Sequence, residues 1–386
     1  LKLETQRFEI VFEAQDESQA RHLASFADEV FDHVSSLLDH RPQRRIPVVI
    51  AGRTAFANGS FSPFPPSITI FTTSPGDRSL GPRSPDWLRT VFVHELTHYL
   101  HLTTPRGLAA VATKLFGPDA VALSTPFMGG WWIEGITTYA ESNLAIGGRG
   151  DDTRFELNYK APILADTMWS LAQGSYQSAR APSGRIYVTG YMFVDYLMQR
   201  YGQDSFAAVN NEFLRWPFFG LDPALQKITG KKGHELFHDA IEALRFSFAP
   251  APAATPSTPF APFDEGDQYL PVAIRDGWLG LVRTPSTGVA LVRYDGEGTI
   301  STIVTRPSVS DSLSFDATDD GSTCLVASPW SDPFDPYAIA TADVTYSDLY
   351  LYRITTDSWQ RLTIGKRLIQ GAISGDGSVI VAIERS

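Results

Sequence analysis

The segment from Thr90 to Leu100 contains two histidines four positions apart, with a glutamate directly after the first: His94, Glu95 and His98. In an α-helix, residues four apart project from the same face, so both imidazoles can bind one metal ion while Glu95 reaches a water molecule beside it. Apolar residues occupy the other faces, as a buried helix requires. The segment therefore predicts a metal-binding helix that carries its own general base.

A zinc site needs a third protein ligand and an open coordination position. The best candidate is Glu134, in the helix-compatible segment from Trp131 to Glu141. Glu141 is an alternative ligand or a supporting carboxylate. His101 lies on roughly the same helix face as the first histidine. Because the metzincin pattern HExxHxxGxxH is absent, we expect His101 to contact a metal ligand or to pack in the core, and not to bind the metal itself. We expect the two HExxH histidines and Glu134 to hold one Zn²⁺ per chain.

These segments resemble the gluzincin metallopeptidases, in particular the branch similar to aminopeptidase N, where HExxH is followed by a helix of the form W-x-x-E-G-x-x-x-Y. Trp131, Glu134, Gly135 and Tyr139 match that second pattern in order. The resemblance implies a thermolysin-like α+β catalytic domain, in which a small sheet precedes a helical lobe. It also implies a zinc-dependent peptidase with Glu95 as general base.

A third motif of the family, Y-x-K-G at a helix start, is matched by the segment from Tyr187 to Leu197, with Thr189 at the lysine position. The resemblance implies that the Tyr187 hydroxyl stabilises the oxyanion of the tetrahedral intermediate. Tyr191, or a histidine such as His234, could fill that role instead. The structural alternative is that both tyrosines are core residues with a solvated hydroxyl.

In this family an edge strand before the HExxH helix pairs with an extended substrate. The alternating segment from Ser67 to Thr73 has that place in the sequence, so Ile68, Thr69 and Ile70 are predicted to contact the substrate backbone. Aminopeptidases of the family carry a glutamate of a G-x-M-E-N motif on this strand, which holds the free amino terminus, and the motif is missing here. We therefore expect an endopeptidase-like enzyme that acts on a peptide or protein.

Two other functions fit the same residues. In the first alternative, the domain with these motifs is a non-catalytic scaffold, and the protein binds a partner through its C-terminal part. In the second, the protein is a zinc hydrolase that acts on a bond other than a peptide bond. Nucleophilic serine or cysteine catalysis has little support, because no GxSxG segment occurs and the one cysteine, Cys324, lies far from the motifs in a predicted buried strand.

Composition limits the remaining possibilities. The chain has 386 residues, 43% of them hydrophobic, and a formal net charge of −11. This length suits two packed domains, and a negative chain without a large basic cluster is not expected to bind nucleic acid. No apolar run is long enough to predict a transmembrane segment, and no signal peptide is recognised. The start at Leu1 instead of methionine is typical of a trimmed chain.

The elements that must position the motifs are predicted from apolar periodicity. A strand, a long amphipathic helix and two further strands precede the HExxH helix, which Ser84, Pro85 and Asp86 are expected to start. Mostly helical segments follow. The predicted strands are 8–12, 47–50 and 67–73, and the predicted helices are 18–40, 86–102, 131–144, 161–173, 187–201, 205–214 and 234–246.

The proline-rich stretch 249–262 cannot form a helix or a central strand and is predicted to link two domains, residues 1–248 and 263–386. Beyond it the apolar period changes to two, and three related segments each end in an Asp-Gly turn before an apolar strand. These segments resemble TolB-like β-propeller blades, of which about two and a half would be present. A small β domain complete in itself is the alternative.

An incomplete propeller has consequences for partners and location. Its open strand edge would be completed by a missing C-terminal fragment, or by a protein partner bound to the propeller. Modules of this kind are common in exported bacterial proteins, so a periplasmic, cell-surface or secreted location is expected by analogy.

Overall fold

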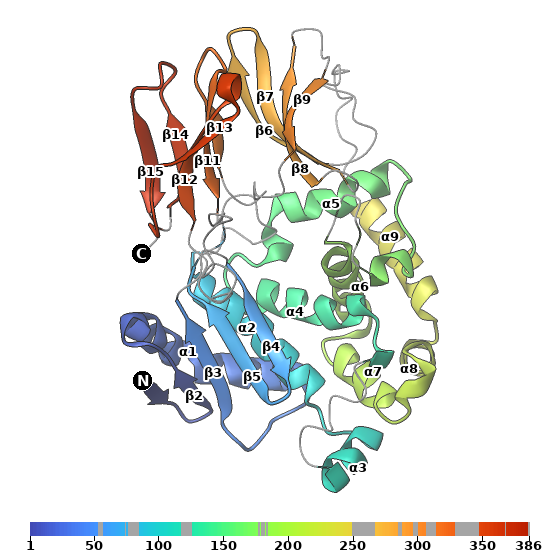
Figure 1. Cartoon of the computed structure of the whole chain (residues 1–386). Helices are drawn as coiled ribbons and strands as arrows, with labels where there is room; N and C mark the ends of the chain where they lie inside the picture. The colour runs from blue at the N-terminus through green and yellow to red at the C-terminus, as the bar shows by residue number, and fades with distance from the viewer. Residues whose placement is uncertain are drawn as a thin grey trace. The chain divides into compact units, whose positions relative to one another are not determined.

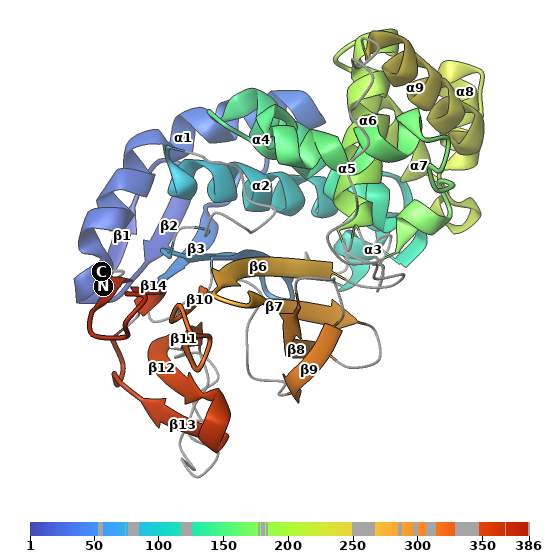
Figure 2. The ribbon, with the colours of Figure 1, turned by 90° about the horizontal axis from the view of Figure 1, so that it is seen from above.

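A computed structural model of the chain describes residues 1–52, 57–73, 75, 85–116, 126–176, 178, 182, 184–248, 267–284, 288–295, 300–305, 314–328, 347–366 and 368–384. The chain divides into two compact units, of which the first takes in most of residues 1–250 and the second most of residues 251–386. The predicted linker 249–262 lies outside the described residues. Helices and strands are numbered in chain order, as the labels in Figures 1 and 2 show.

The first unit begins with a five-stranded mixed sheet. Its strand order is β1-β2-β3-β5-β4, with parallel pairs β2–β3 and β3–β5 and antiparallel pairs at both edges. Strand β4 is therefore an outer strand, and β5 lies inside the sheet. The strands are β1 (Lys2–Glu4), β2 (Phe8–Val11), β3 (Ile46–Ala51), β4 (Gly59–Pro63) and β5 (Pro66–Phe71).

Two helices, α1 (Glu17–Leu38) and α2 (Trp87–Leu102), cover one face of this sheet (Figures 1 and 2). Alternate strand residues are fully buried, among them Ile68 of β5. The rings of Phe8 on β2 and Phe92 on α2 pack edge to face, with centroids 5.2 Å apart. Close packing of large side chains at this interface fixes α2 over the sheet.

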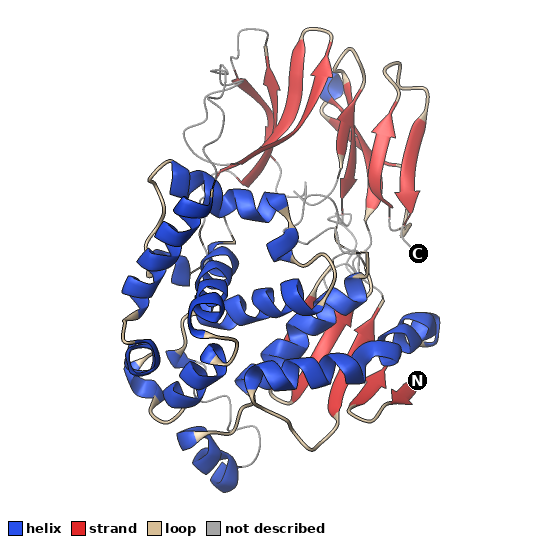
Figure 3. Ribbon diagram, turned by 180° about the vertical axis from the view of Figure 1, so that it is seen from behind, coloured by secondary structure: helices blue, strands red, loops and turns tan. Residues whose placement is uncertain are grey.

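Helices make up most of the rest of the first unit, as the blue ribbons of Figure 3 show. Helices α4 and α6 pack against one another extensively. The helices after α2 are α3 (Gly107–Phe116), α4 (Gly130–Leu144), α5 (Thr153–Leu164), α6 (Arg185–Tyr201), α7 (Ser205–Phe213), α8 (Asp222–Thr229) and α9 (Gly233–Ser247). Short 3₁₀ turns are η1 (Ala14–Asp16), η3 (Arg149–Asp151), η4 (Gln173–Ser175) and η5 (Pro217–Phe219).

Helices α4 and α6 cross where each carries a glycine. A side-chain carbon at Gly135 would lie 2.5 Å from the carbonyl oxygen of Gly190, and one at Gly190 would meet the backbone of Trp131. Any larger residue would push the helices apart, so glycine is required for this close approach. The crossing thereby sets the position of Glu134 on α4 relative to Tyr187 on α6.

The second unit is rich in β-structure. Its described strands form two four-stranded sheets and one two-stranded sheet, all antiparallel, and these strands do not close into a propeller. Cys324 of β11 is fully buried in the apolar contact between the first two sheets, as predicted. The sheets are β6 (Asp267–Ile274) to β9 (Ile300–Thr305), β10 (Phe315–Ala317) to β13 (Ser358–Arg361), and β14 (Leu368–Ile373) with β15 (Ile380–Glu384).

The remaining elements of the two larger sheets are β7 (Gly277–Thr284), β8 (Gly288–Tyr294), β11 (Thr323–Ser328) and β12 (Asp348–Arg353), with the 3₁₀ turn η6 (Ile354–Thr356) after β12.

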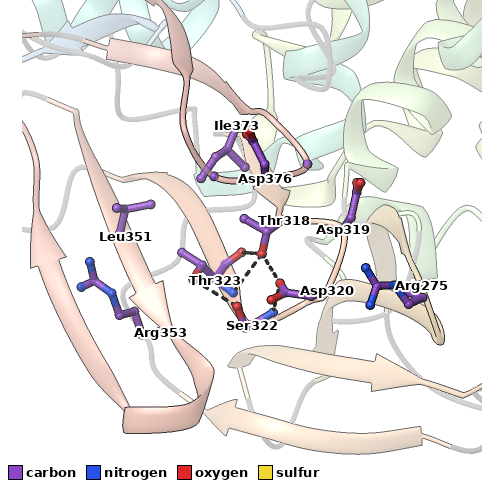
Figure 4. Close-up of a pocket in the computed structure, with 12 residues that line it drawn as sticks. Arg275, Thr318, Asp319, Asp320, Ser322, Thr323, Leu351, Arg353, Ile373 and Asp376 are labelled. Carbon is purple, nitrogen blue, oxygen red and sulfur yellow. Dashed lines mark hydrogen bonds between the residues drawn. The ribbon is translucent and has the colours of Figure 1, made fainter.

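Two Asp-Gly turns of this unit have the same internal hydrogen bonds. In the β10–β11 turn, Oδ1 of Asp320 accepts from the hydroxyl of Thr318 at 2.7 Å and from Ser322 N–H at 2.9 Å (Figure 4). In the β14–β15 turn, Oδ1 of Asp376 accepts from the hydroxyl two residues earlier at 2.6 Å and from Ser378 N–H at 3.0 Å. This agreement supports the interpretation of the Asp-Gly segments as equivalent units of a repeat.

The structure agrees with most predicted elements of the first unit and corrects one helix. The helix predicted at 161–173 is instead α5, which ends at Leu164 and begins after Asp152, whose side chain accepts from Arg154 N–H and caps the first turn. Strands β1 and β4 and helices α3 and α8 were not predicted from periodicity.

Candidate metal centre

Helix α2 carries the HExxH residues. It begins after Asp86, whose side chain accepts from Arg89 N–H at 3.1 Å, so Asp86 caps the helix; Ser84 lies outside the described residues. From Thr90 onward the helix is almost wholly buried, so its polar side chains need partners inside the protein. The rings of His94 and His98 lie edge to face, with centroids 4.8 Å apart.

Helix α4 supplies the third residue of the cluster. Oε2 of Glu134 lies 3.5 Å from Nε2 of His94 and 3.3 Å from Nε2 of His98. One ligand atom from each of the three residues lies within 4.8 Å of the others. Two imidazoles and a carboxylate at this spacing could hold a metal ion. The structure thus brings together the three residues that the sequence predicted as ligands.

The electrostatics of the cluster suit a cation. Burial acts to lower the pKa of His94, but the carboxylates of Glu134 and Glu141 outweigh it and raise that pKa to about 9. Burial acts to raise the pKa of Glu134, but the nearby histidines hold it below its ordinary value. Oε2 of Glu134 is buried without a hydrogen bond of suitable geometry among the described residues. A carboxylate oxygen directed at two imidazoles fits a metal ion, because such groups bind a metal when they are deprotonated.

A second carboxylate orients the first histidine. Oε2 of Glu141 lies 2.8 Å and Nη2 of Arg149 2.9 Å from Nδ1 of His94, while Nε2 of the same ring lies 3.5 Å from Oε2 of Glu134. With its proton on Nδ1, the imidazole donates to Glu141 and presents Nε2 to the cluster. Burial acts to raise the pKa of Glu141, but the Arg149 guanidinium and His94 lower it to about 2. Of the two roles that the sequence left open for Glu141, its contacts match the supporting one. Arg149 was not predicted.

Glu95 lies where strand β4 meets helix α2. Its side chain is buried, and Gly59 of β4 packs directly against it. A side-chain carbon at Gly59 would lie 2.8 Å from Oε1 of Glu95 and 2.6 Å from a methyl group of Val91. The glycine therefore leaves the space that the Glu95 carboxylate occupies.

Of the two candidate tyrosines, Tyr187 is the one beside the cluster. Its ring centroid lies 6.4 Å from that of His94, and burial, followed by the charge of Glu134, raises its pKa to about 12. The hydroxyl is therefore protonated at neutral pH and can donate a hydrogen bond. Tyr191 packs against Phe155, with ring centroids 5.7 Å apart. His234 is exposed on α9.

His101 is a packing residue of α2, as the sequence favoured. Its Nε2 lies 3.0 Å from Oδ1 of Asn210 on α7, and its ring meets Phe206 edge to face. Burial lowers its pKa to about 3, so it is a neutral imidazole. It is not part of the metal-binding group.

The predicted substrate strand is misplaced by one position in the sheet. Strand β5 pairs with β3 on one side, where Thr69 opposes Val49, and with β4 on the other, where Thr69 opposes Ser60. Ile68 and Ile70 are fully buried. The prediction that Ile68, Thr69 and Ile70 form an edge was therefore wrong, because the short, glycine-containing strand β4 covers β5.

Comparison with known proteins adds limited information. No family model matches the sequence. An uncharacterized protein of Treponema pallidum (strain Nichols) is 29% identical over 211 residues, which make up 53% of this chain and 18% of that protein. The chain thus matches less than a fifth of the length of this curated relative.

One solved structure with some similarity is the crystal structure of an aminopeptidase N family protein from Idiomarina loihiensis. The TM-score is 0.40 at 12% identity, and the match covers 78% of this chain and 65% of that one. Neither likeness places the chain in a family. Among the described helices, none combines the length and hydropathy needed to cross a membrane.

Proposed function

We propose that the first unit is a zinc-dependent peptidase that hydrolyses peptide bonds. The observation that carries this proposal is the buried group of His94, His98 and Glu134, with Glu95 next to it on α2. Two histidines and a glutamate form a common ligand set of catalytic zinc, and three protein ligands leave a coordination position open for the reaction.

Each polar residue of the site has a role in this reaction. His94, His98 and Glu134 would hold the zinc ion, whose chemistry when bound is Lewis-acid polarisation of water and of a carbonyl group. Glu95 would take the proton of the attacking water and pass it to the leaving amine. The neutral hydroxyl of Tyr187 would donate a hydrogen bond to the carbonyl oxygen as negative charge develops on it.

Strand β4 supports a specific mode of substrate binding. Among the described strands it pairs only with β5, and Gly59 on it touches Glu95. An extended peptide that adds to the outer edge of β4 would therefore pass close to the general base. The five residues of β4, Gly59–Pro63, include no acid that could hold a free amino terminus, which favours an endopeptidase over an aminopeptidase.

The test joins metal content with hydrolysis. The wild-type protein and the Glu95→Gln variant are reconstituted with zinc, analysed for zinc per chain, and incubated with a mixed peptide library. The matched control is Glu242→Gln, the same change at an exposed carboxylate of α9. We expect about one zinc per chain in all three proteins, and a loss of cleavage in Glu95→Gln of roughly 10²- to 10⁴-fold, the usual contribution of a general base.

The other outcomes separate the alternatives. A wild-type protein that binds no zinc would remove the basis of the proposal, and equal cleavage by Glu95→Gln would remove Glu95 as the base. Stoichiometric zinc without cleavage of any peptide would favour hydrolysis of another bond or a non-catalytic scaffold. Cleavage sites within peptides, as opposed to their ends, would support the endopeptidase assignment.

For the second unit we infer a propeller-like repeat. The matching turns around Asp320 and Asp376 and the series of antiparallel sheets support this inference. Completion of the unit by further C-terminal sequence, a protein partner on its surface, and export of the protein stay predictions.

A further inference from the structure

Arg149 makes an unusually complete set of contacts for a residue outside every sequence motif. Its Nε donates to Oε1 of Glu141 at 2.6 Å and its Nη2 to Oε2 at 2.9 Å, so the guanidinium and the carboxylate pair through two parallel hydrogen bonds. Both side chains are buried, with 13% of the Arg149 side chain and 2% of the Glu141 side chain exposed. This is a fixed ion pair and not a mobile surface contact.

The same guanidinium contacts groups of the metal centre on both α4 and α6. Oε2 of Glu141 is shared, because it lies 2.8 Å from Nδ1 of His94 and also accepts from Arg149. The guanidinium carbon lies 4.5 Å from the ring centroid of Tyr187, which places the cation over that ring. Nη2 of Arg149 also lies 2.9 Å from Nδ1 of His94 itself. Arg149 therefore contacts a proposed metal-binding histidine, the carboxylate beside that histidine, and the tyrosine expected to donate to the substrate.

A tight loop after α4 positions Arg149 beside Glu141. Arg149 follows Gly147 and Gly148, a few residues after the end of α4 at Leu144, and a side-chain carbon at Gly148 would lie 2.5 Å from the backbone of Glu141. The backbone N–H of Arg149 itself donates to Oε1 of Glu141 at 3.2 Å. Because backbone and side chain bind one carboxylate, the loop and the guanidinium are held as a unit.

We propose that Arg149 is a positioning residue that couples the orientation of His94 to the placement of the Tyr187 hydroxyl. It holds the first proposed zinc ligand, His94, both directly and through Glu141, and its guanidinium plane holds the Tyr187 ring. The inference rests on the proposed peptidase function and adds a residue that the HExxH, W-x-x-E-G and Y-x-K-G patterns do not contain. The competing reading is a purely structural ion pair, which would affect stability without separating zinc binding from turnover.

Arg149→Lys is the central variant, because lysine can donate to Glu141 but has no plane to lie over the Tyr187 ring. We expect it to bind zinc within about threefold of wild type while kcat falls at least tenfold and KM changes little, since loss of a positioning contact misplaces the hydroxyl. Zinc affinity is measured by competition with a chromogenic chelator, and thermal melting verifies the fold.

Arg149→Met removes the contact with Glu141 as well. We expect zinc affinity to fall by roughly 10- to 100-fold, as for other partners of a ligating histidine. If this variant does not fold, Arg149→Gln is the second variant, because its uncharged amide cannot pair with both oxygens of Glu141, and it should also lower zinc affinity. The matched control is Arg89→Met: Arg89 binds Glu29 at 2.9 Å and lies over Phe26 at 5.3 Å, away from the cluster, and its loss should leave zinc affinity unchanged.

A double-mutant cycle with Tyr187→Phe decides the coupling. In a protein that already lacks the hydroxyl, Arg149→Lys should lower kcat no further, because its effect acts through that group. Fully additive losses, or wild-type kcat in Arg149→Lys, would overturn the proposal, as would unchanged zinc affinity in Arg149→Met. Failure of the peptidase function itself would already be visible in the wild-type and Glu95→Gln proteins, and the zinc-affinity measurements do not depend on finding a substrate.

Discussion

Two pairs of acidic residues, one pair from each unit, are satisfied in different ways. In the first unit, Glu141 is buried and Glu134 partly buried, and both face groups from other segments of the chain. In the second, Asp320 and Asp376 are bound by hydroxyl and N–H groups of residues two positions away. A turn carboxylate therefore needs only its own segment, whereas the metal-centre carboxylates need the whole tertiary structure. Only the arrangement in the first unit, where Oε2 of Glu134 accepts no hydrogen bond of suitable geometry among the described residues, leaves a carboxylate oxygen for a metal ion.

The largest expected effect is on zinc affinity and peptide cleavage, when a carboxylate of the metal centre is removed. Glu134→Ala removes one of three proposed ligands, so zinc affinity should fall by more than the roughly 100-fold that loss of an outer partner costs, and peptide cleavage should disappear. Zinc competition and the peptide assay measure both. Asp320→Ala, which removes a turn carboxylate of the second unit, is the control and should change neither; equal zinc affinity in the two variants would contradict the ligand assignment.

A smaller loss of activity is expected where backbone packing positions the base. Gly59→Ala places a methyl group within 2.8 Å of Oε1 of Glu95, so the carboxylate must shift. A displacement of about 1 Å can cost roughly 100-fold in rate, and we expect kcat to fall by about 10- to 100-fold with zinc content unchanged. Ser36→Ala, at an exposed position of α1, should behave as wild type. Wild-type turnover by Gly59→Ala would show that Glu95 has room to move.

A substitution at the crossing of α4 and α6 should lower the free energy of unfolding. Gly190→Ala would bring a methyl group against the backbone of α4, and overpacking of this kind costs about 1–3 kcal/mol. Urea unfolding followed by circular dichroism measures the change. Gln199→Ala, at an exposed position of the same helix, should stay within about 0.5 kcal/mol of wild type. A neutral Gly190→Ala would mean that α4 and α6 can separate without penalty.

The smallest effect is expected at the turn carboxylates and depends on pH. Hydrogen bonds from the Ser374 hydroxyl and Ser378 lower the pKa of Asp376 to about 2, below the value of about 3.9 in an unfolded chain. The stabilisation is therefore present above about pH 4 and is lost as pH falls toward 2. The difference in urea midpoint between wild type and Asp376→Asn should shrink between pH 6 and pH 2.5. A constant difference would exclude this carboxylate as its source.

The sequence predicted the parts of the site that follow from helical spacing. His94, Glu95 and His98 lie on one helix, Glu134 and Glu141 on another, and these patterns are visible without a structure. Arg149 could not be predicted, because nothing in its neighbourhood but a run of glycines indicates that it folds back onto Glu141. Its role depends on contacts between segments far apart in the chain.

The error at the sheet edge has a similar cause. The alternation in Pro66–Phe71 correctly indicated a strand, but alternation alone does not show whether a strand is covered by another. Strand β4 has a weak pattern, with a glycine at its start and a proline at its end, and was missed. In the second unit, periodicity predicted strands and turns, whereas closure into a propeller depends on contacts that local pattern does not encode.

The single cysteine gives the protein a chemical reporter of its own. Cys324 is fully buried in β11, and burial raises the pKa of its thiol to about 12, so a thiol-reactive dye has no access to it while the sheets stay closed. Trp131, Trp132 and Trp169 are buried in the first unit, and Trp278 and Trp359 lie in the second, so tryptophan fluorescence follows both units. Dye reaction at Cys324 therefore reports on the second unit alone, and comparison with the fluorescence change would show whether the two units lose their structure together or one after the other.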